Sequence, residues 1–211
     1  MERKLSDEKA RLFFEDLWKF GDPWDLETSQ FEKDKYDLQL AMLGNHRYPR
    51  ALEIGCGAGA FTRRLSVIAD RVLALDISAN AIAKAQQAKL EYGSVEYRVA
   101  NVMDYSVGDQ GPWDLVVMSE TICYLGWLYS FFDVAWLAAE LFAATRTAGQ
   151  FLMANTCGGV EDYLLRPWII RTYRDLFLNV GYQLKSEEMF RGSKNGAELE
   201  VLISLFAKGS E

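Results

Sequence analysis

The sequence has few of the residues that bind metals or form covalent cross-links, with one histidine and three cysteines among 211 residues. The cysteines Cys56, Cys123 and Cys157 are an odd number, lie far apart and form no CxxC or Cys/His pattern. These spacings exclude a zinc ribbon and a disulfide framework, and they are typical of a protein from a reducing compartment. We therefore expect a cytoplasmic protein without a metal site.

Long apolar runs are also missing, since none approaches the roughly 18 uncharged residues that a membrane-spanning helix needs. The N-terminus, MERKLSDEKARLFF, is charged throughout and contains no apolar core of signal-peptide length. The most apolar stretch, ICYLGWLYSFFDVAWLAAELFAA, is interrupted by Asp133 and Glu140 and predicts a strand end followed by a buried helix. We expect no membrane partner.

Basic residues are fewer than acidic ones, 23 against 30, which gives a net charge of −7. Nucleic-acid binding depends mainly on clustered Lys and Arg, so this balance argues against a nucleic-acid partner and favours a small molecule. Half of the residues are hydrophobic, which is enough for one sizeable core. The sequence leaves the choice between a monomer and a homodimer open.

From residue 50 onward, short apolar runs alternate with helix-length segments, the pattern of βαβ units in a parallel sheet. Helices are predicted for AFTRRLSVIA and for ANAIAKAQQAKLEYG, which ends at Gly93. Right-handed crossovers would place helices on both faces of the sheet. The predicted strands lie near 50–54, 71–75, 96–99, 114–119 and 149–154.

The pattern changes after residue 160. RPWIIRTYRDLFLNVG predicts a helix with Pro167 in its first turn and Gly181 just beyond its end. YQLKSEEMF and ELEVLISLFAK predict two strands that pair with each other, joined by the loop RGSKNGA. The fold class is therefore α/β, with five parallel strands followed by a hairpin.

The first 49 residues contain no strand signal but have three aromatic-rich blocks, ARLFFEDLWKF, GDPWDLETSQF and EKDKYDLQLAML. They are too few for a separate core, so we interpret residues 1–49 as a helical arm, or cap, packed on a main domain of residues 50–211.

A glycine-rich loop, LEIGCGAGAF at residues 52–61, follows the first predicted strand. In parallel sheets the ligand lies beyond the carboxyl ends of the strands, and bare glycines let the backbone approach it. Asp76 ends the second strand, where a carboxylate can accept hydrogen bonds from both hydroxyls of a ribose. An adenosine-bearing cofactor is expected, but the loop alone also fits the G-x-G-x-x-G/A pattern of an NAD-dependent oxidoreductase.

Two features favour S-adenosylmethionine over a dinucleotide. Glu53 and Gly59 extend the loop to E-x-G-x-G-x-G, and the C-terminal hairpin has no place in a six-stranded dinucleotide fold. With residues 51–61, Asp76 and NVMDY together, the sequence resembles the class I S-adenosylmethionine-dependent methyltransferases over roughly residues 48–207. The resemblance implies a Rossmann-like sheet of seven strands in the order 3-2-1-4-5-7-6, with the seventh strand antiparallel and helices on both faces.

The resemblance also implies the cofactor S-adenosyl-L-methionine, the product S-adenosyl-L-homocysteine and the cofactor contacts. Gly55 and Gly57 would lie near the methionine portion, Asp76 on the ribose and Ile77 against the adenine. Glu53 would act indirectly, through water or the backbone, near the cofactor's ammonium. The full implied set is Trp24, Glu53, Gly55, Gly57, Gly59, Asp76, Ile77, Asn101, Val102 and Ser119, where Asn101 and Val102 contact the adenine edge.

A closer resemblance rests on DPWDLETSQFEKDKY and SETICYL, which are similar to motifs of the nodulation protein S family. That family methylates an amine on the terminal sugar of a deacetylated chitooligosaccharide. An amine of a small-molecule or oligosaccharide acceptor is therefore expected here. An O-methyltransferase of a sugar or natural product and a non-catalytic module that only binds the cofactor stay open as alternatives.

Glu120 and Tyr124 follow the fourth strand and are the predicted catalytic residues. Glu120 would take the proton of an amine or orient a sugar hydroxyl, and Tyr124 would hydrogen-bond the acceptor or line the methyl path. The alternative is that Glu120 caps the next helix and Tyr124 packs in the core. Trp24 would close over the cofactor as a lid, or else anchor the arm.

Other arm and loop residues are weaker candidates. In the arm, Tyr36 is expected to face the acceptor and Glu32 to face solvent. Asp162 and Tyr163 would border the acceptor pocket or merely begin a helix, and His46 precedes the first strand, at the edge of the sheet away from the site. No [DN]PP[YFW] motif follows the fourth strand, which argues against a nucleic-acid or translation-factor substrate. The sequence also lacks the Asp-Asp-Asn set that would suggest a catecholate metal site.

Overall fold

The computed structural model describes residues 2–88, 93–159 and 161–209 of the chain. Within these residues one sheet contains seven strands in the order β3-β2-β1-β4-β5-β7-β6. The pairs among β1 to β5 are parallel, and β7 runs antiparallel to both β5 and β6. The sheet order inferred from the sequence is confirmed. The strands are β1 (Tyr48–Ile54), β2 (Ala69–Asp76), β3 (Ser94–Val99), β4 (Trp113–Ser119), β5 (Thr145–Gly158), β6 (Tyr182–Lys194) and β7 (Ala197–Lys208).

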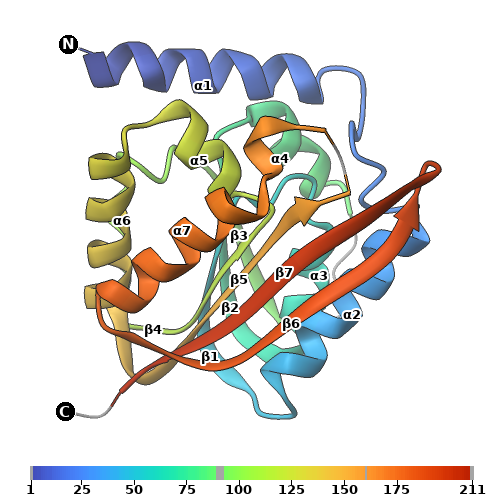
Figure 1. The fold of residues 1–211 in the computed structure, drawn as a ribbon. Coiled ribbons are helices and arrows are strands. Elements are labelled where there is room, and N and C mark those ends of the chain that lie inside the picture. The colour runs from blue at the N-terminus through green and yellow to red at the C-terminus, as the bar shows by residue number, and fades with distance from the viewer. Residues whose placement is uncertain (1, 89–92, 160, 210–211) are drawn as a thin grey trace.

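Helices cover both faces of this sheet (Figure 1). Alternate residues of a strand point to opposite faces. Accordingly, Leu52 and Ile54 join a core with α5, α6 and α7, while Ala51 joins a second core with α2 and α3. The helices are α1 (Glu2–Trp18), α2 (Gln30–Leu43), α3 (Ala60–Ile68), α4 (Ala79–Ala85), α5 (Ile122–Leu128), α6 (Phe131–Ala144) and α7 (Pro167–Asn179), with the short 3-10 helix η1 (Tyr163–Leu165) before α7.

The structure extends two predicted strands, since β1 begins at Tyr48 within the predicted arm and β5 spans Thr145–Gly158. Three further sequence-based boundaries were wrong. The helix predicted to reach Gly93 ends at Ala85. The N–H groups of Gln87 and Ala88 then donate to the carbonyl oxygens three residues back, and 89–92 lie outside the described residues. The RGSKNGA loop is mostly strand, because Asn195 and Gly196, with φ of 52° and 81°, make a two-residue hairpin turn.

The third wrong boundary is in the apolar stretch 122–144, which contains no strand end. It forms two helices, α5 and α6, because the Ser130 hydroxyl accepts from the Asp133 N–H and starts a new helix. α6 is also not fully buried, since 73% of Phe132 and 62% of Trp136 are exposed.

The predicted arm, residues 1–49, supplies α1 and α2. α1 lies across the carboxyl-terminal edge of the parallel strands, and α2 packs beside the β6–β7 hairpin (Figure 1). α1 is attached by Glu15, whose carboxylate accepts from the backbone N–H groups of Ala79 and Asn80 at 2.8 and 3.1 Å and from the Ser78 hydroxyl at 3.1 Å. The arm therefore encloses the sheet edge where a ligand is expected.

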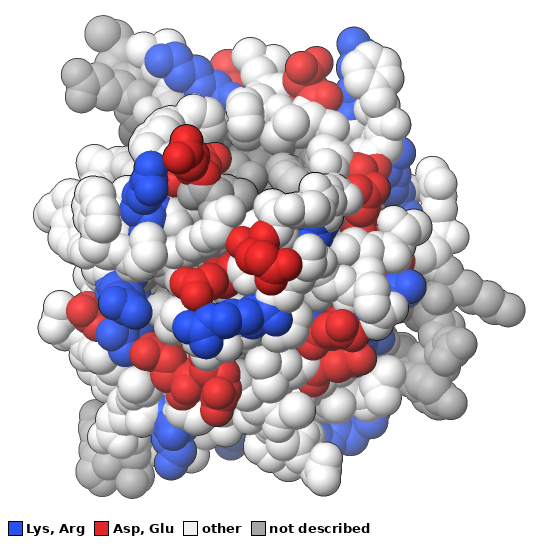
Figure 2. Space-filling view, turned by 45° about the vertical axis from the view of Figure 1, so that its right-hand side comes forward, with Lys and Arg blue, Asp and Glu red and all other residues white. Residues whose placement is uncertain are grey.

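Acidic and basic side chains are interspersed on the face drawn in Figure 2, without a broad area of either charge. Among the described residues, every helix is too short or too polar to cross a lipid bilayer. The part of the chain that the structure describes also contains no group of three or more His, Cys, Asp or Glu side chains arranged to hold a metal ion.

Candidate functional site

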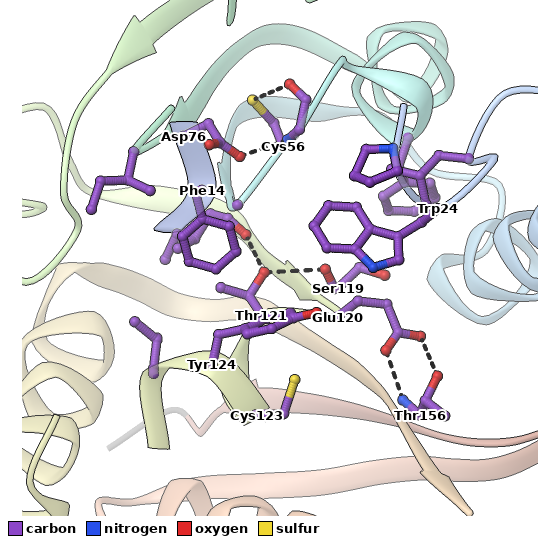
Figure 3. Close-up of a pocket in the computed structure, with 18 of the residues that line it drawn as sticks. Phe14, Trp24, Cys56, Asp76, Ser119, Glu120, Thr121, Cys123, Tyr124 and Thr156 are labelled. Carbon is purple, nitrogen blue, oxygen red and sulfur yellow. Dashed lines mark hydrogen bonds between the residues drawn. The ribbon is translucent and has the colours of Figure 1, made fainter. Parts of the chain in front are cut away.

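A pocket of about 410 Å³ lies at the carboxyl ends of β1, β2 and β4 and is closed by the arm (Figure 3). Its size falls within the range of small-molecule sites, roughly 300–1,000 Å³. The wall combines the loop after β1, the ends of β2 and β4, residues 100–102, α1, α2 and the tip of the β6–β7 hairpin. Of the residues predicted to bind the cofactor, all but Gly59 line this pocket.

The three loop glycines have left-handed backbone conformations, with φ of 76° at Gly55, 53° at Gly57 and 78° at Gly59. A Cβ at Gly55 would lie 2.3 Å from the Thr121 hydroxyl, and one at Gly57 would lie 2.8 Å from the Trp18 ring. The protein itself therefore also requires glycine at these positions, in addition to the expected approach of a ligand. Neighbouring side chains occupy that space and hold the loop in a conformation that non-glycine residues adopt at a cost.

Asp76 links the glycine loop to the end of β2. One carboxylate oxygen accepts from the Gly57 N–H and the other from the Ser78 N–H, both at 2.8 Å. Burial raises the pKa of Asp76 to about 6, so the carboxylate is mostly ionised at neutral pH. Each oxygen keeps acceptor capacity for a further donor, which fits a pair of ribose hydroxyls.

Glu53 lies in β1 beneath the loop and is 3% exposed. Its Oε2 atom has no hydrogen-bond partner, and burial raises the pKa of its carboxyl group to about 8. Buried carboxyl oxygens are rarely left unpaired, so this atom fits a ligand that brings a cation or a donor. The ammonium group of S-adenosylmethionine has this chemistry.

At the other end of the pocket, Asn101 is held by the arm. Its amide nitrogen donates to Asp7 Oδ1 and to the Tyr129 hydroxyl, both at 2.9 Å, while its carbonyl oxygen accepts from the Met103 N–H at 3.1 Å. The second lone pair of that carbonyl is the acceptor that an adenine amino group could use. Ile77 and Val102 supply apolar surface beside it.

Four aromatic side chains form what we call the aromatic wall: Phe14, Trp18, Trp24 and Tyr124 (Figure 3 labels three of them). Ring centroids lie 5.1 Å apart for Phe14 and Tyr124, 5.6 Å for Trp18 and Trp24, and 6.2 Å for Trp24 and Tyr124. Such ring faces attract a positive charge and exclude water. The sequence reasoning missed Phe14 and Trp18, although their i, i+4 spacing in ARLFFEDLWKF places them on one helix face.

Glu120 occupies the first position after β4 and has a left-handed backbone conformation, with φ of 57°. Its Oε2 accepts from the Thr156 N–H at 2.8 Å, and its Oε1 accepts from the Thr156 hydroxyl at 3.1 Å and from Lys35 Nζ at 3.0 Å. Figure 3 shows the carboxylate turned toward Thr156. These partners belong to α2 and β5 rather than to the first turn of α5, so the carboxylate does not act as the cap of that helix.

Tyr124 lies one turn into α5, and its ring joins the aromatic wall. Burial is the main cause that raises the pKa of its hydroxyl, so the group remains protonated at neutral pH. Ser119, at the end of β4, has a buried hydroxyl oxygen without a hydrogen-bond partner and lines the same side of the pocket. Both hydroxyls can serve a ligand.

The expected solvent exposure of Glu32 is wrong. Glu32 is 4% exposed, and its carboxylate lies 2.6 Å from Lys35 Nζ and 2.5 Å from Lys194 Nζ, which makes burial of the charge possible. Tyr36 lines the pocket and stacks on Phe61 with centroids 5.0 Å apart. The sequence reasoning gave no role to Lys35 or Lys194.

The remaining candidates lie outside the pocket or are chemically inert. The ring centroids of His46 and Tyr48 lie 4.6 Å apart, and His46 is not among the pocket-lining residues. Asp162 accepts from the Leu164 N–H and starts η1, and Tyr163 is 61% exposed. Cys56 lines the pocket, but burial raises the pKa of its thiol well above the ordinary value, which argues against a nucleophile.

The sheet order, the glycine loop and the buried Asp76 together define a class, the class I S-adenosylmethionine-dependent methyltransferases. Residues 6–143 match the family model of nodulation protein S (NodS). The chain belongs to the nodulation protein S family.

Two curated relatives support this assignment, and one solved structure shares the fold. Nodulation protein S of Bradyrhizobium diazoefficiens is 32% identical over 166 residues, which cover 77% of this chain and 73% of the relative. The Sinorhizobium fredii protein is 35% identical over 105 residues, about half of each chain at 49% and 48%. The fold matches the crystal structure of N-methyltransferase NodS from Bradyrhizobium japonicum in complex with S-adenosyl-L-homocysteine, with a TM-score of 0.80, 19% identity and coverage of 95% and 99%.

The raised pKa values of Asp76 and Glu53 predict how cofactor binding depends on pH. Below about pH 6 Asp76 takes up a proton and can no longer accept from two hydroxyls, so affinity for S-adenosylhomocysteine should fall by up to about tenfold per pH unit. At pH 7 Glu53 is mostly protonated, and a bound ammonium would favour its ionised form, so binding should release protons.

Calorimetry in two buffers of different ionisation enthalpy measures both effects. Glu53→Gln is the matched control, because it should remove most of the proton release at pH 7 without removing the dependence on Asp76. Proton release that is equal in the wild type and Glu53→Gln would contradict the role of Glu53.

Proposed function

We propose that the protein transfers a methyl group from S-adenosylmethionine to an amine of an amino sugar at the end of an oligosaccharide, such as a deacetylated chitooligosaccharide. Membership of the nodulation protein S family and the structural similarity to an N-methyltransferase of that family support an amine acceptor. In this proposal the enzyme works in the cytoplasm, in keeping with its three free cysteines.

The observation that carries the proposal is the arrangement around Glu120. A carboxylate offers about four acceptor positions, and three of them are used by Thr156 and Lys35. The Glu120 side chain is 26% exposed and lines the pocket. The remaining hydrogen-bonding position, on Oε2, is therefore available to the substrate that receives the methyl group. An amine N–H is a suitable donor for it.

In this mechanism the bound cofactor supplies a methyl group that is already activated on a sulfonium. Glu120 accepts a hydrogen bond from the neutral amine, aims its lone pair along the transfer direction and takes the proton that leaves the nitrogen. Tyr124, which stays protonated, donates a hydrogen bond from its hydroxyl group to the acceptor. The aromatic wall keeps water out and presents ring faces to positive charge.

The size of the pocket supports an extended acceptor whose terminal unit alone enters. A volume of about 410 Å³ lies near the lower end of the range for small-molecule sites, and the cofactor takes much of it. The other sugars of an oligosaccharide would then remain outside the pocket.

Methyl transfer to paired acceptors tests this proposal. A glucosamine oligomer with one free terminal amine should be methylated on nitrogen, on the order of 10² times faster or more than the same oligomer fully N-acetylated, because the acetylated control lacks the attacking lone pair. Mass spectrometry of the product locates the methyl group. Methylation of the acetylated control on oxygen at an equal rate would replace the proposal with an O-methyltransferase.

A further inference from the structure

Lys35 is a buried cation at the junction between the arm and the sheet. It is 1% exposed, and its ammonium lies 3.0 Å from Glu120 Oε1 and 2.6 Å from Glu32 Oε2. Burial is the largest influence on its pKa and lowers it, but the two carboxylates outweigh burial and the pKa is raised overall. Lys35 is therefore charged throughout the physiological pH range.

Opposite charges alternate from the hairpin to the end of β4. Lys194, at the hairpin tip, binds Glu32 at 2.5 Å and the Trp24 carbonyl oxygen at 2.6 Å. Glu32 thus has an ammonium on each side, and the second of these, Lys35, also pairs with Glu120. Because Lys194 neutralises Glu32, the charge of Lys35 remains available to Glu120.

The Glu120 side chain is also held in position. Its left-handed backbone is a conformation that surrounding contacts must maintain, and such residues concentrate at functional sites. Thr156 holds both carboxylate oxygens from one side, and Lys35 holds one of them from the other. This geometry leaves Oε2 with a free acceptor position.

We propose that Lys35 is a positioning residue for methyl transfer, which holds the Glu120 carboxylate so that its free acceptor position is directed at the incoming amine. The inference rests on the proposed function and adds to it a residue from the arm. The arm then contributes to proton transfer as well as to enclosing the cofactor.

Other titratable groups around Glu120 do not compete for this role. Burial is the main cause that raises the pKa of each neighbouring tyrosine and cysteine, so these groups stay neutral across the pH range of the test. The charged groups that pair with Glu120, directly or through Lys35, are those of the Lys194–Glu32–Lys35 series. Glu53, whose pKa is about 8, and Asp162 also act on Tyr36 and Tyr124, respectively. The groups considered are Glu32, Lys35 and Tyr36 from α2, Cys123 and Tyr124 from α5, Cys157 from β5 and Lys194 from the hairpin tip.

Lys35→Met removes the ammonium and keeps an unbranched side chain, and Lys33→Met makes the same change on the same helix at a residue outside the pocket. With the free-amine oligomer at pH 7, we expect kcat/KM of Lys35→Met to fall on the order of 10²-fold. The acid limb of the pH profile should move to higher pH, because removal of a cation beside a carboxylate favours its protonated form, and the rate should partly recover at high pH. Lys33→Met should behave as the wild type.

Glu120→Gln provides the second half of a double-mutant cycle. If Lys35 acts through Glu120, the Lys35→Met/Glu120→Gln double variant should be no slower than Glu120→Gln alone. Losses that multiply in the double variant would overturn the proposal and make Lys35 a structural residue.

If Lys35→Met does not bind S-adenosylhomocysteine, the variant has not folded, and Thr156→Val then takes its place in the test. It removes one hydrogen bond from Glu120 Oε1 and leaves every charge in place, so the same limb should move in the same direction by a smaller amount. Unchanged pH profiles in the folded variants would overturn the inference, whereas a wild type that methylates no amine would refute the proposed function instead.

Discussion

Asp76→Ala is expected to weaken the binding of S-adenosylhomocysteine by about 10²- to 10⁴-fold, as measured by calorimetric titration. Hydrogen bonds to a charged acceptor contribute about 1.5–3 kcal/mol each, and the variant would lose two such bonds from the ribose hydroxyls. The same substitution leaves the N–H groups of Gly57 and Ser78 without their acceptor, so the glycine loop also loses its link to β2.

Asp70→Ala is the matched control for this experiment. Asp70 lies at the other end of β2, where its side chain is 54% exposed and pairs with Arg47 on the surface. Exposed ion pairs contribute at most about 1 kcal/mol, so affinity and stability should remain near the wild-type values. Equal affinity in both variants would show that Asp76 does not bind the ligand.

Glu120→Gln is expected to lower kcat with the free-amine oligomer by about 10²- to 10³-fold, because the variant loses its proton acceptor. One end of the new amide would also be a donor facing either Lys35 Nζ or the Thr156 N–H, where the carboxylate accepts from both. Binding of S-adenosylhomocysteine should change by no more than about threefold, since the loss arises in the transfer step.

Glu140→Gln makes the same change on the exposed surface of α6 and should leave kcat unaltered. Steady-state kinetics of the two variants, each with its affinity for S-adenosylhomocysteine, distinguish a transfer defect from a folding defect. If Glu120→Gln keeps full kcat, proton transfer must use another group, and both the proposed role of Glu120 and that of Lys35 fail.

Most of the fold could be predicted because the central strands are continuous apolar runs between recognisable helices. β4, for example, is buried along nearly its whole length, as a strand covered on both faces should be. The errors arose where local contacts decide the outcome. The Ser130 cap divides 122–144 into two helices, and the Asn195–Gly196 turn lets the hairpin strands pair to their ends.

The site was predictable where one short motif contains it. Gly55, Gly57 and Asp76 follow from the first two strands, and all three line the pocket. The environment of Glu120 was not predictable, because Lys35 lies 85 positions away in the sequence and Lys194 lies 162 positions from Glu32. Charged residues in a polar segment such as FEKDKY are usually solvated, and only tertiary packing shows that two of them are buried.

The most direct test of the whole account is a crystal structure of the protein with S-adenosyl-L-homocysteine. We expect the ribose on Asp76, the amino-acid portion beside Glu53 and the glycine loop, and the sulfur directed toward the part of the pocket that contains Glu120. A ligand bound away from the bend between β1 and α3, or with its sulfur directed away from Glu120, would contradict it.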